Sequence, residues 1–166
     1  MTTNQIEEYC CGFCFIGGTP LHVVLIQKGH PESQRGLLNG IGGRIKEDEL
    51  PVSAMTREFR EETGVDTDEL GWSHFVTLSR PLVRVWFFRR FDEWRSGTCV
   101  RSEGKGELVC TEEVDALLRG ERQRTYLVSD LRWLIPLALD RNIAPGGVIF
   151  NDSPLTSPLR KEECHP

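Results

Sequence analysis

The sequence predicts an α/β fold in which a mixed β-sheet is packed between helices. Two pairs of apolar, β-rich runs predict the strands, and two segments with helical start and stop signals predict the helices. The strand-like runs cover residues 9–16, 21–28, 72–79 and 83–91. Helical patterns occupy residues 51–64 and 129–141, between and after these strand pairs. Because helices flank the strands, we expect a mixed sheet packed in an α/β sandwich.

The first strand pair is separated by GGTP at 17–20, which predicts a hairpin. A Gly-rich loop follows and ends in GLLNGIGG at 36–43. The first helix is expected to begin at Pro51 and to stop at Gly64, since proline suits a first helical turn and glycine a helix end. The apolar residues of this helix fall on one face: Val52, Met55 and Phe59.

Later elements are less regular. The run 72–79 and the run 83–91 are joined across 80–82, and a polar, Gly-containing loop is expected at 92–107. A short strand or turn should follow around LVCTEEVDAL. The second helix takes Ser129 or Asp130 as its cap, and Pro136 should delay its start or kink it. The expected domain spans 1–150, with a loose Pro- and Ser-rich tail at 151–166.

The composition argues against several classes of function. The net charge of −5 over 166 residues argues against binding a nucleic-acid polymer through bulk electrostatics. No apolar run approaches a membrane span and the N-terminus lacks signal-peptide order, so we expect a cytosolic protein without membrane attachment. Three of the six cysteines lie in the apolar run YCCGFCFIGG. Without a second pair at ligand spacing, they are interpreted as buried thiols rather than a zinc site.

The helix at 51–64 concentrates negative charge. Glu58, Glu61 and Glu62 stand at i, i+3 and i+4 and therefore share one helix face, adjacent to the apolar face. Such carboxylates repel one another unless the face is solvated or a hard cation is bound. Mg²⁺ prefers oxygen ligands and is usually held by a few carboxylates together with substrate phosphates. This helix face is therefore either a solvated acidic surface or a metal site.

A wider spacing favours the metal site. Gly43 is followed after five residues by Glu49, and after seven more by REFREETGV at 57–65. This stretch resembles the Nudix box, and every specified position of the box is matched. The resemblance implies the Nudix α/β/α sandwich over residues 8–150. It also implies hydrolysis of a nucleoside diphosphate linked to another group, with Mg²⁺ or Mn²⁺ as cofactor.

The resemblance also implies roles for individual residues. Glu61 and Glu62 are expected to bind the metal, and Glu58 to bind it or to accept the proton of the attacking water. The Gly43 carbonyl is expected to be a further ligand. The family pattern gives Arg57 and Glu49 the task of holding loop and helix in register. Members of the family often add a later acidic residue, for which we select Glu113 over its neighbour Glu112; the alternative is a solvated pair in a turn.

Substrate contacts are indicated less directly. LNGIGGR at 38–44 is similar to the stretch that precedes the box in the human 8-oxo-dGTPase of this family, which makes Asn39 a candidate for reading a base; Asn-Gly is also a common turn. Asp130 is a candidate for the same task or a helix cap. The aromatic candidates for stacking are Phe13, Trp86 and Trp133, although aromatics at such spacing are more often core residues. A nucleoside triphosphate, intact or oxidised, is the first expectation.

Two alternatives stay open. Pro81 lies sixteen residues after Val65, a position at which ADP-ribose hydrolases of the Nudix family tend to carry proline, so ADP-ribose or another dinucleotide is the second expected substrate. A non-catalytic nucleotide sensor of the same fold is the other alternative, although such modules usually have a damaged box. The expected partner is a small nucleotide, and a homodimer is possible in this family.

Overall fold

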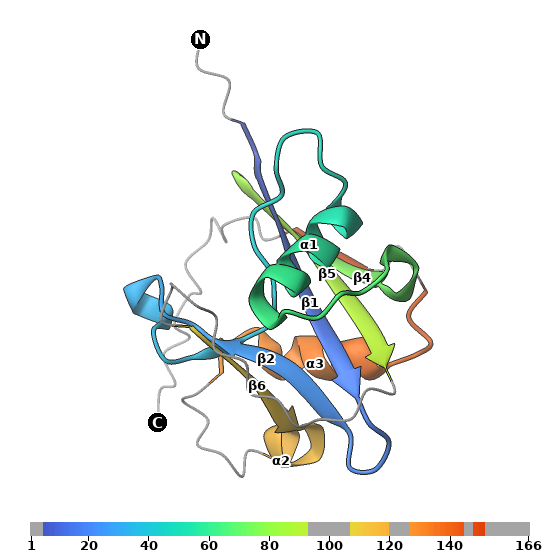
Figure 1. The fold of residues 1–166 in the computed structure, drawn as a ribbon. Helices are drawn as coiled ribbons and strands as arrows, with labels where there is room; N and C mark the ends of the chain where they lie inside the picture. The colour runs from blue at the N-terminus through green and yellow to red at the C-terminus, as the bar shows by residue number, and fades with distance from the viewer. Residues whose placement is uncertain (1–4, 93–106, 120–126, 145–147, 152–166) are drawn as a thin grey trace, which may run out of the picture.

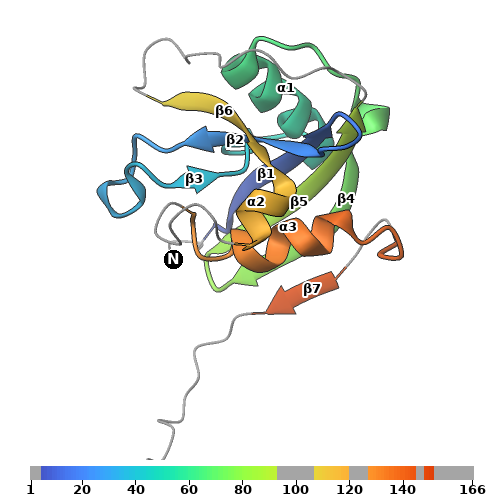
Figure 2. The same cartoon turned by 90° about the horizontal axis from the view of Figure 1, so that it is seen from below.

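The computed structural model describes residues 5–92, 107–119, 127–144 and 148–151. The strands are β1 (Glu7–Ile16), β2 (His22–Gln27), β3 (Leu38–Asn39), β4 (Ser73–Arg80), β5 (Val83–Asp92), β6 (Leu108–Glu113) and β7 (Val148–Asn151), and the helices are α1 (Pro51–Thr63), α2 (Val114–Arg119) and α3 (Leu131–Leu139). Within the described ranges, the strands form one seven-stranded sheet in the order β3-β2-β1-β5-β4-β7, with β6 also paired to β2. Figure 2 shows α1 on one face of this sheet and α2 and α3 on the other. The predicted mixed sheet and α/β/α sandwich are confirmed.

The central strand β1 organises the sheet. It pairs antiparallel with β2, as the predicted hairpin requires, and parallel with β5 along its whole length. The Gly-rich loop also returns to β1. Gly12 and Ile41 exchange backbone hydrogen bonds of 2.7 and 3.1 Å, and the Cys10 N–H donates to the Gly43 carbonyl at 2.9 Å. The loop is therefore fixed to the middle of the sheet just before α1 begins (Figure 1).

Helix α1 follows the predicted bounds closely. Pro51 is its first residue, and Gly64 ends it with a left-handed φ of 73°. Met55 and Phe59 are fully buried against the sheet, and Val52 packs at the edge of the same cluster. Burial of this apolar face stabilises a helix that, at thirteen residues, would be marginal alone.

The distance between α1 and the sheet depends on one glycine of β1. A Cβ at Gly12 would lie 2.5 Å from the Met55 Sδ and 2.9 Å from Cζ3 of Trp72. Both contacts are far inside van der Waals separation. A side chain at position 12 would therefore require the Met55 thioether and the Trp72 ring to move.

The second half of the chain contains two elements that the sequence did not predict. β4 and β5 form the expected hairpin around Pro81, but α2 directly follows β6, and β7 adds a parallel strand beside β4. The predicted loop at 92–107 falls largely within 93–106, and the predicted tail within 152–166, both outside the described residues. No described helix is long and apolar enough to span a membrane.

Helix α3 differs in detail from its prediction. It begins at Leu131, ahead of Pro136, so the proline does not delay it. Asp130 occupies the N-cap position, but its side chain makes no capping hydrogen bond and instead accepts one from the Ser129 hydroxyl at 3.1 Å. Asp130 therefore stands at the predicted N-cap position, but neither it nor Ser129 supplies the expected capping hydrogen bond.

The C-terminal end of α3 is held by a buried arginine of β5. Arg89 donates to the carbonyls of Ala138, Asp140 and Ile143 at 3.2, 2.6 and 2.7 Å. A cation stabilises the end of a helix because the last carbonyls carry partial negative charge. Arg89 therefore ties this end of α3 firmly to the sheet.

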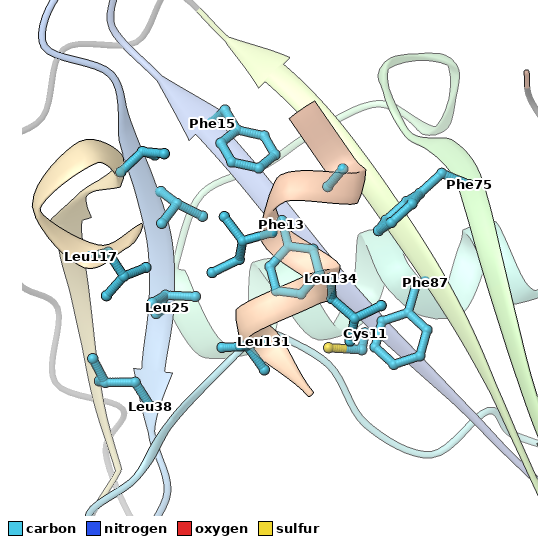
Figure 3. Packing of buried hydrophobic residues seen from close by; sticks show 14 of the residues in the cluster. Cys11, Phe13, Phe15, Leu25, Leu38, Phe75, Phe87, Leu117, Leu131 and Leu134 are labelled. Atoms are coloured by element: carbon cyan, nitrogen blue, oxygen red, sulfur yellow. The ribbon is translucent and has the colours of Figure 1, made fainter. Parts of the chain in front are cut away.

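Two hydrophobic clusters fill the space between the layers. The cluster that faces α3 contains Phe13, Phe15, Leu25, Leu131 and Leu134 (Figure 3). The cluster that faces α1 contains Cys10, Ile41, Met55, Phe59 and Trp72. Alternate residues of β1 thus enter opposite clusters, as expected for a strand covered on both faces.

The cysteines behave as the sequence predicted wherever they are described. Cys10, Cys11 and Cys14 are buried free thiols of β1, whereas Cys99 and Cys164 lie outside the described residues. Burial raises the pKa of the Cys10 and Cys14 thiols to about 12 and also raises that of Cys11. These thiols are protonated at neutral pH and act as small apolar side chains.

Candidate active site

Arg57 connects the loop before α1 to the acidic face of the helix. Its Nε and Nη2 donate to the two oxygens of Glu49 at 2.8 and 2.9 Å, and Nη2 also donates to the Arg44 carbonyl at 3.1 Å. Its Nη1 donates to Glu58 at 2.6 Å and to Glu61 at 3.3 Å. A two-pronged pair of this kind fixes orientation as well as distance. Arg57 and Glu49 therefore occupy the positions that the register role implies.

Glu49 and Arg57 each stabilise the charged form of the other. Hydrogen bonding from Arg57 lowers the pKa of Glu49 to about 2, and the same contact raises the pKa of Arg57. The Lys46 backbone N–H adds a 3.0 Å bond to Glu49. Both groups stay charged at neutral pH, so the clamp on the start of α1 is permanent.

Glu58 is buried at the point where α1 meets the Gly-rich loop. It is 9% exposed, and Gly43 packs directly against its carboxylate. A Cβ at Gly43 would lie 2.5 Å from the Glu58 Cδ and 2.6 Å from each carboxylate oxygen. The Gly43 carbonyl itself accepts the Cys10 N–H and lies 3.6 Å from the Cys10 thiol, so β1 already uses this predicted metal ligand.

Glu62 is the most unusual acid of the helix. It is 7% exposed, and its Oε2 is buried with no hydrogen-bond partner among the described residues. Burial raises its pKa to about 7; the neighbouring Glu107 and Glu58 contribute, while Lys28 and a backbone hydrogen bond from Gly42 oppose the rise. An unpaired, buried carboxylate oxygen is costly, which suggests that a ligand completes it.

Glu107 was not predicted from the sequence. It lies just before β6, is 6% exposed, and accepts a 3.2 Å ion pair from Lys28 Nζ and a 3.3 Å hydrogen bond from the Gly29 N–H. Its charge acts on Glu62. The only signal in the sequence is that Lys28 directly follows the strand β2, which pairs with β6, and that pairing was unknown without the fold.

Glu113 is placed elsewhere. It sits at the opposite end of β6, across from His22, whereas Leu108, next to Glu107, lies across from Gln27. Glu107 and Glu113 are six residue steps apart along the strand, which is roughly 20 Å. The structure brings Glu107, and not Glu113, to the acidic face of α1. Glu112 is buried on the other sheet face, where its partner Val23 belongs to the cluster facing α3.

The proposed substrate contacts are not all available. Phe13 is fully buried, with its ring 6.4 Å from that of Phe87 and 6.2 Å from that of Phe75. Its prediction as a stacking residue is corrected: it is a core residue, because both faces of β1 are covered. Trp133 is 37% exposed on α3, one turn after Asp130, so these two share a face near the start of the helix.

Asn39 lies at the end of β3. Its Oδ1 accepts the Gly40 N–H at 2.8 Å, the local bond expected of a turn, which leaves Nδ2 as the part of the amide available for recognition. Its cross-strand partner Ile26 belongs to the α1-facing cluster. Antiparallel partners point to the same face, so Asn39 lies on the face that carries α1. The segment that leads into α3 runs beside β3: Leu38 pairs with Leu127, and the Leu38 carbonyl accepts the Val128 N–H at 3.0 Å. Asp130 therefore follows closely after a segment that is bonded to the strand of Asn39.

The acidic residues Glu58, Glu62 and Glu107 offer ligand atoms that fit a divalent metal ion. These atoms are carboxylate oxygens, and one buried oxygen of Glu62 lacks any partner in the described part of the chain. However, no three His, Cys, Asp or Glu side chains within the described residues converge on one ready-made metal position. Arg57 and Lys28 instead hold Glu58 and Glu107 through ion pairs. The residues fit a hard cation, and the site must rearrange locally to bind it.

Comparison with protein families gives a match to the NUDIX domain over residues 13–141, which is most of the chain. The chain belongs to the Nudix family. The resemblance of residues 43–65 to the Nudix box is thereby confirmed, and the box residues are those that build the acidic site. By its family, this Nudix protein is a pyrophosphohydrolase that acts on nucleoside diphosphate derivatives, and hydrolases of this family generally use divalent cations.

Solved structures show the same Nudix fold. The NUDIX domain of NrtR from Shewanella oneidensis, in complex with ADP ribose, has a TM-score of 0.65 at 22% identity, covering 83% of this chain and 88% of that one. The mutator MutT protein from Bacillus halodurans has a TM-score of 0.60 at 16% identity, covering 90% and 92%. A NUDIX hydrolase from Nitrosomonas europaea has 0.59 at 14%, covering 89% and 80%. Comparison with curated proteins gave no match.

The pKa of Glu62 makes a prediction about stability. The unfolded carboxyl ionises near 4.5, and the folded one near 7 because it is buried. Between these values the folded state holds the extra proton, so the free energy of unfolding of the metal-free protein falls as pH rises from 4.5 to 7. The loss is at most about 3 kcal/mol at 1.36 kcal/mol per pKa unit. Urea unfolding in EDTA between pH 4.5 and 7 measures this loss of free energy. If the free energy of unfolding of a Glu62→Gln variant depends on pH as strongly as that of wild type, Glu62 is not the group responsible.

Proposed function

We propose that this Nudix protein hydrolyses a nucleoside triphosphate, intact or oxidised, to the monophosphate and pyrophosphate, using Mg²⁺ or Mn²⁺. The observation that carries the metal-dependent hydrolysis is the unpartnered, buried oxygen of Glu62 beside two other buried carboxylates, Glu58 and Glu107. The choice of a triphosphate rests on the resemblance of residues 38–44. Buried carboxylates in one place destabilise the protein unless a cation offsets them. A retained site of this kind argues against a sensor with a damaged box.

The proposed ligands are Glu61, Glu62 and Glu107. Glu61 presents a half-exposed side chain from the last turn of α1, and Glu107 takes the role that the sequence suggested for Glu113. When bound, the divalent cation offsets the charge of the diphosphate, lowers the pKa of a coordinated water and aligns the displacement at phosphorus. The Gly43 carbonyl, held by β1, is a weaker candidate ligand than the three carboxylates.

Glu58 is proposed to accept the proton of the attacking water. Its carboxylate is fixed on one side by Arg57 and on the other by Gly43, so it cannot swing away from the site. A carboxylate that accepts a proton must be ionised and must be held within hydrogen-bonding reach of the attacking water, and the contacts of Glu58 supply the second requirement. Arg57 acts as a positioning residue, since it is bonded to Glu49 and to the loop carbonyl of Arg44.

The nucleoside is proposed to be read by groups outside the Nudix box. Trp133 offers an exposed ring and Asp130 a carboxylate on the same face of α3. Asn39 offers its Nδ2 donors. ADP-ribose is kept as the second candidate because Pro81 lies exposed in the β4–β5 turn, at the spacing from the box that suggested this substrate.

A nucleotide panel tests the proposal. The full chain is incubated with dGTP, 8-oxo-dGTP, ADP-ribose, NADH and diadenosine polyphosphates in Mg²⁺ or Mn²⁺, and the products are separated by chromatography. We expect pyrophosphate and a nucleoside monophosphate from a triphosphate. Preferential formation of AMP and ribose 5-phosphate would select ADP-ribose instead. Tight binding of one compound without cleavage of any would overturn the enzymatic proposal in favour of a sensor.

A further inference from the structure

Lys28 stands out among the charged residues around the site. It follows β2 directly, and its Nζ lies 3.2 Å from the Glu107 Oε1; the two side chains are only 17% and 5% exposed. The positive charge of Lys28 also acts on the carboxylate of Glu62. Lys28 therefore pairs with one of the proposed metal ligands, acts electrostatically on a second, and carries the same sign of charge as the metal.

A nearly buried ion pair of this kind contributes little net stability. Removing both charges from water costs several kcal/mol per ion, roughly as much as their attraction returns. A gain in stability therefore does not explain why Lys28 lies beside Glu107. A better explanation is that its positive charge offsets the negative charge of the buried carboxylates Glu58, Glu62 and Glu107.

The two cations at the site differ in how they are held. Arg57 is fixed by a two-pronged bond to Glu49 and contacts to three other groups. Lys28 makes a single-point ion pair at the end of a flexible four-carbon chain. Only Lys28 can leave its partner without breaking the frame of the site.

We propose that Lys28 is an exchangeable counter-ion of the metal site: its ammonium neutralises Glu107 in the metal-free protein, is displaced when a divalent cation binds Glu107, and then binds a phosphate of the substrate. The inference rests on the proposed metal site and adds to it a residue that sets both metal affinity and phosphate recognition. No bond is made or broken in this exchange, and no further reactant is needed. The swap keeps the charge of Glu107 balanced at every stage.

The test separates metal binding from turnover. Lys28→Met keeps the aliphatic stem and removes the charge. Isothermal titration of Mn²⁺ into the full chain at pH 8, without nucleotide, should show about tenfold tighter binding than wild type, because the ion pair between Lys28 and Glu107 no longer has to be broken before Glu107 binds the metal ion. With the substrate selected by the panel, KM should rise about tenfold while kcat changes much less. A merely structural role for Lys28 would weaken both kinds of binding.

Two further variants complete the experiment. Lys28→Arg preserves the pair in a folded protein, and the guanidinium should hold Glu107 more firmly, so that Mn²⁺ binds more weakly than in wild type. Arg35→Met removes one positive charge from the loop after β2, where Arg35 is 61% exposed, and should leave Mn²⁺ affinity unchanged.

Weaker or unaltered Mn²⁺ binding by Lys28→Met would overturn the counter-ion role, and tighter binding by Lys28→Arg would do the same. Absence of Mn²⁺ binding by the wild-type protein would instead refute the proposed metal site itself. The two failures are therefore distinguishable.

Discussion

Glu62→Gln is expected to lower kcat at least about a thousandfold, because metal ions contribute several kcal/mol of transition-state stabilisation and each factor of ten corresponds to about 1.4 kcal/mol. The amide has the shape of the carboxylate but lacks its charge. The unpartnered Oε2 of Glu62 is the oxygen whose loss should matter most. Steady-state kinetics with the substrate chosen by the panel measure the effect.

The same change should make the metal-free protein more stable at pH 8. Ionised Glu62 is buried without full compensation, and a neutral amide avoids that cost, up to about 3 kcal/mol. Thermal unfolding in EDTA shows whether stability and turnover move in opposite directions. Glu47→Gln, an identical change at an exposed residue of the preceding loop, is the control. Full activity of the Glu62 variant would remove Glu62 from the metal site.

Gly43→Ala is expected to lower kcat about a hundredfold with a smaller effect on stability. The new Cβ would occupy the space of the Glu58 carboxylate, 2.6 Å from both oxygens, so the carboxylate must move by about 1 Å. Misplacement of a catalytic group by that distance can cost a factor of about 100. The overpacking itself should cost about 1–3 kcal/mol in unfolding free energy.

Gly18→Ala provides the matched control. No heavy atom lies within 4 Å of a Cβ built at Gly18, so this substitution should leave kcat unchanged. Rate measurements and thermal unfolding of both variants separate displacement of Glu58 from general destabilisation. A Gly43→Ala enzyme with wild-type kcat would show that Glu58 is not the proton acceptor at its observed position.

Several elements could be predicted because their signals are local. The hairpin from β1 to β2 has its turn residues between two apolar runs, and α1 has proline and glycine at its ends. In contrast, α2 has six residues and β7 four. Elements this short are stabilised by pairing and packing that only the fold supplies, such as the pairing of β7 with β4.

The residues of the site also fall into those that local spacing predicts and those that only the fold brings together. The spacing within the Nudix box identified Glu58, Glu61, Glu62 and Arg57, because helical periodicity determines which of them share a face. Glu107 escaped prediction because its partner Lys28 is distant in sequence and meets it only through the pairing of β2 with β6. Phe13 stayed open between a stacking role and a core position because the sequence of one strand does not reveal which of its faces is covered. Both faces are covered, so Phe13 is a core residue.

The glycine at position 12 has a consequence for engineering this enzyme. Substrate range should be adjustable through the outer face of α3, where Trp133 is exposed, without disturbing the hydrolytic chemistry. Gly12 offers less freedom, since a side chain there would collide with Met55 and Trp72, two residues of the cluster on which the helix with the acidic residues packs. In a mutational library, this position on β1 should be as intolerant of change as the carboxylates themselves, although it bears no reactive group.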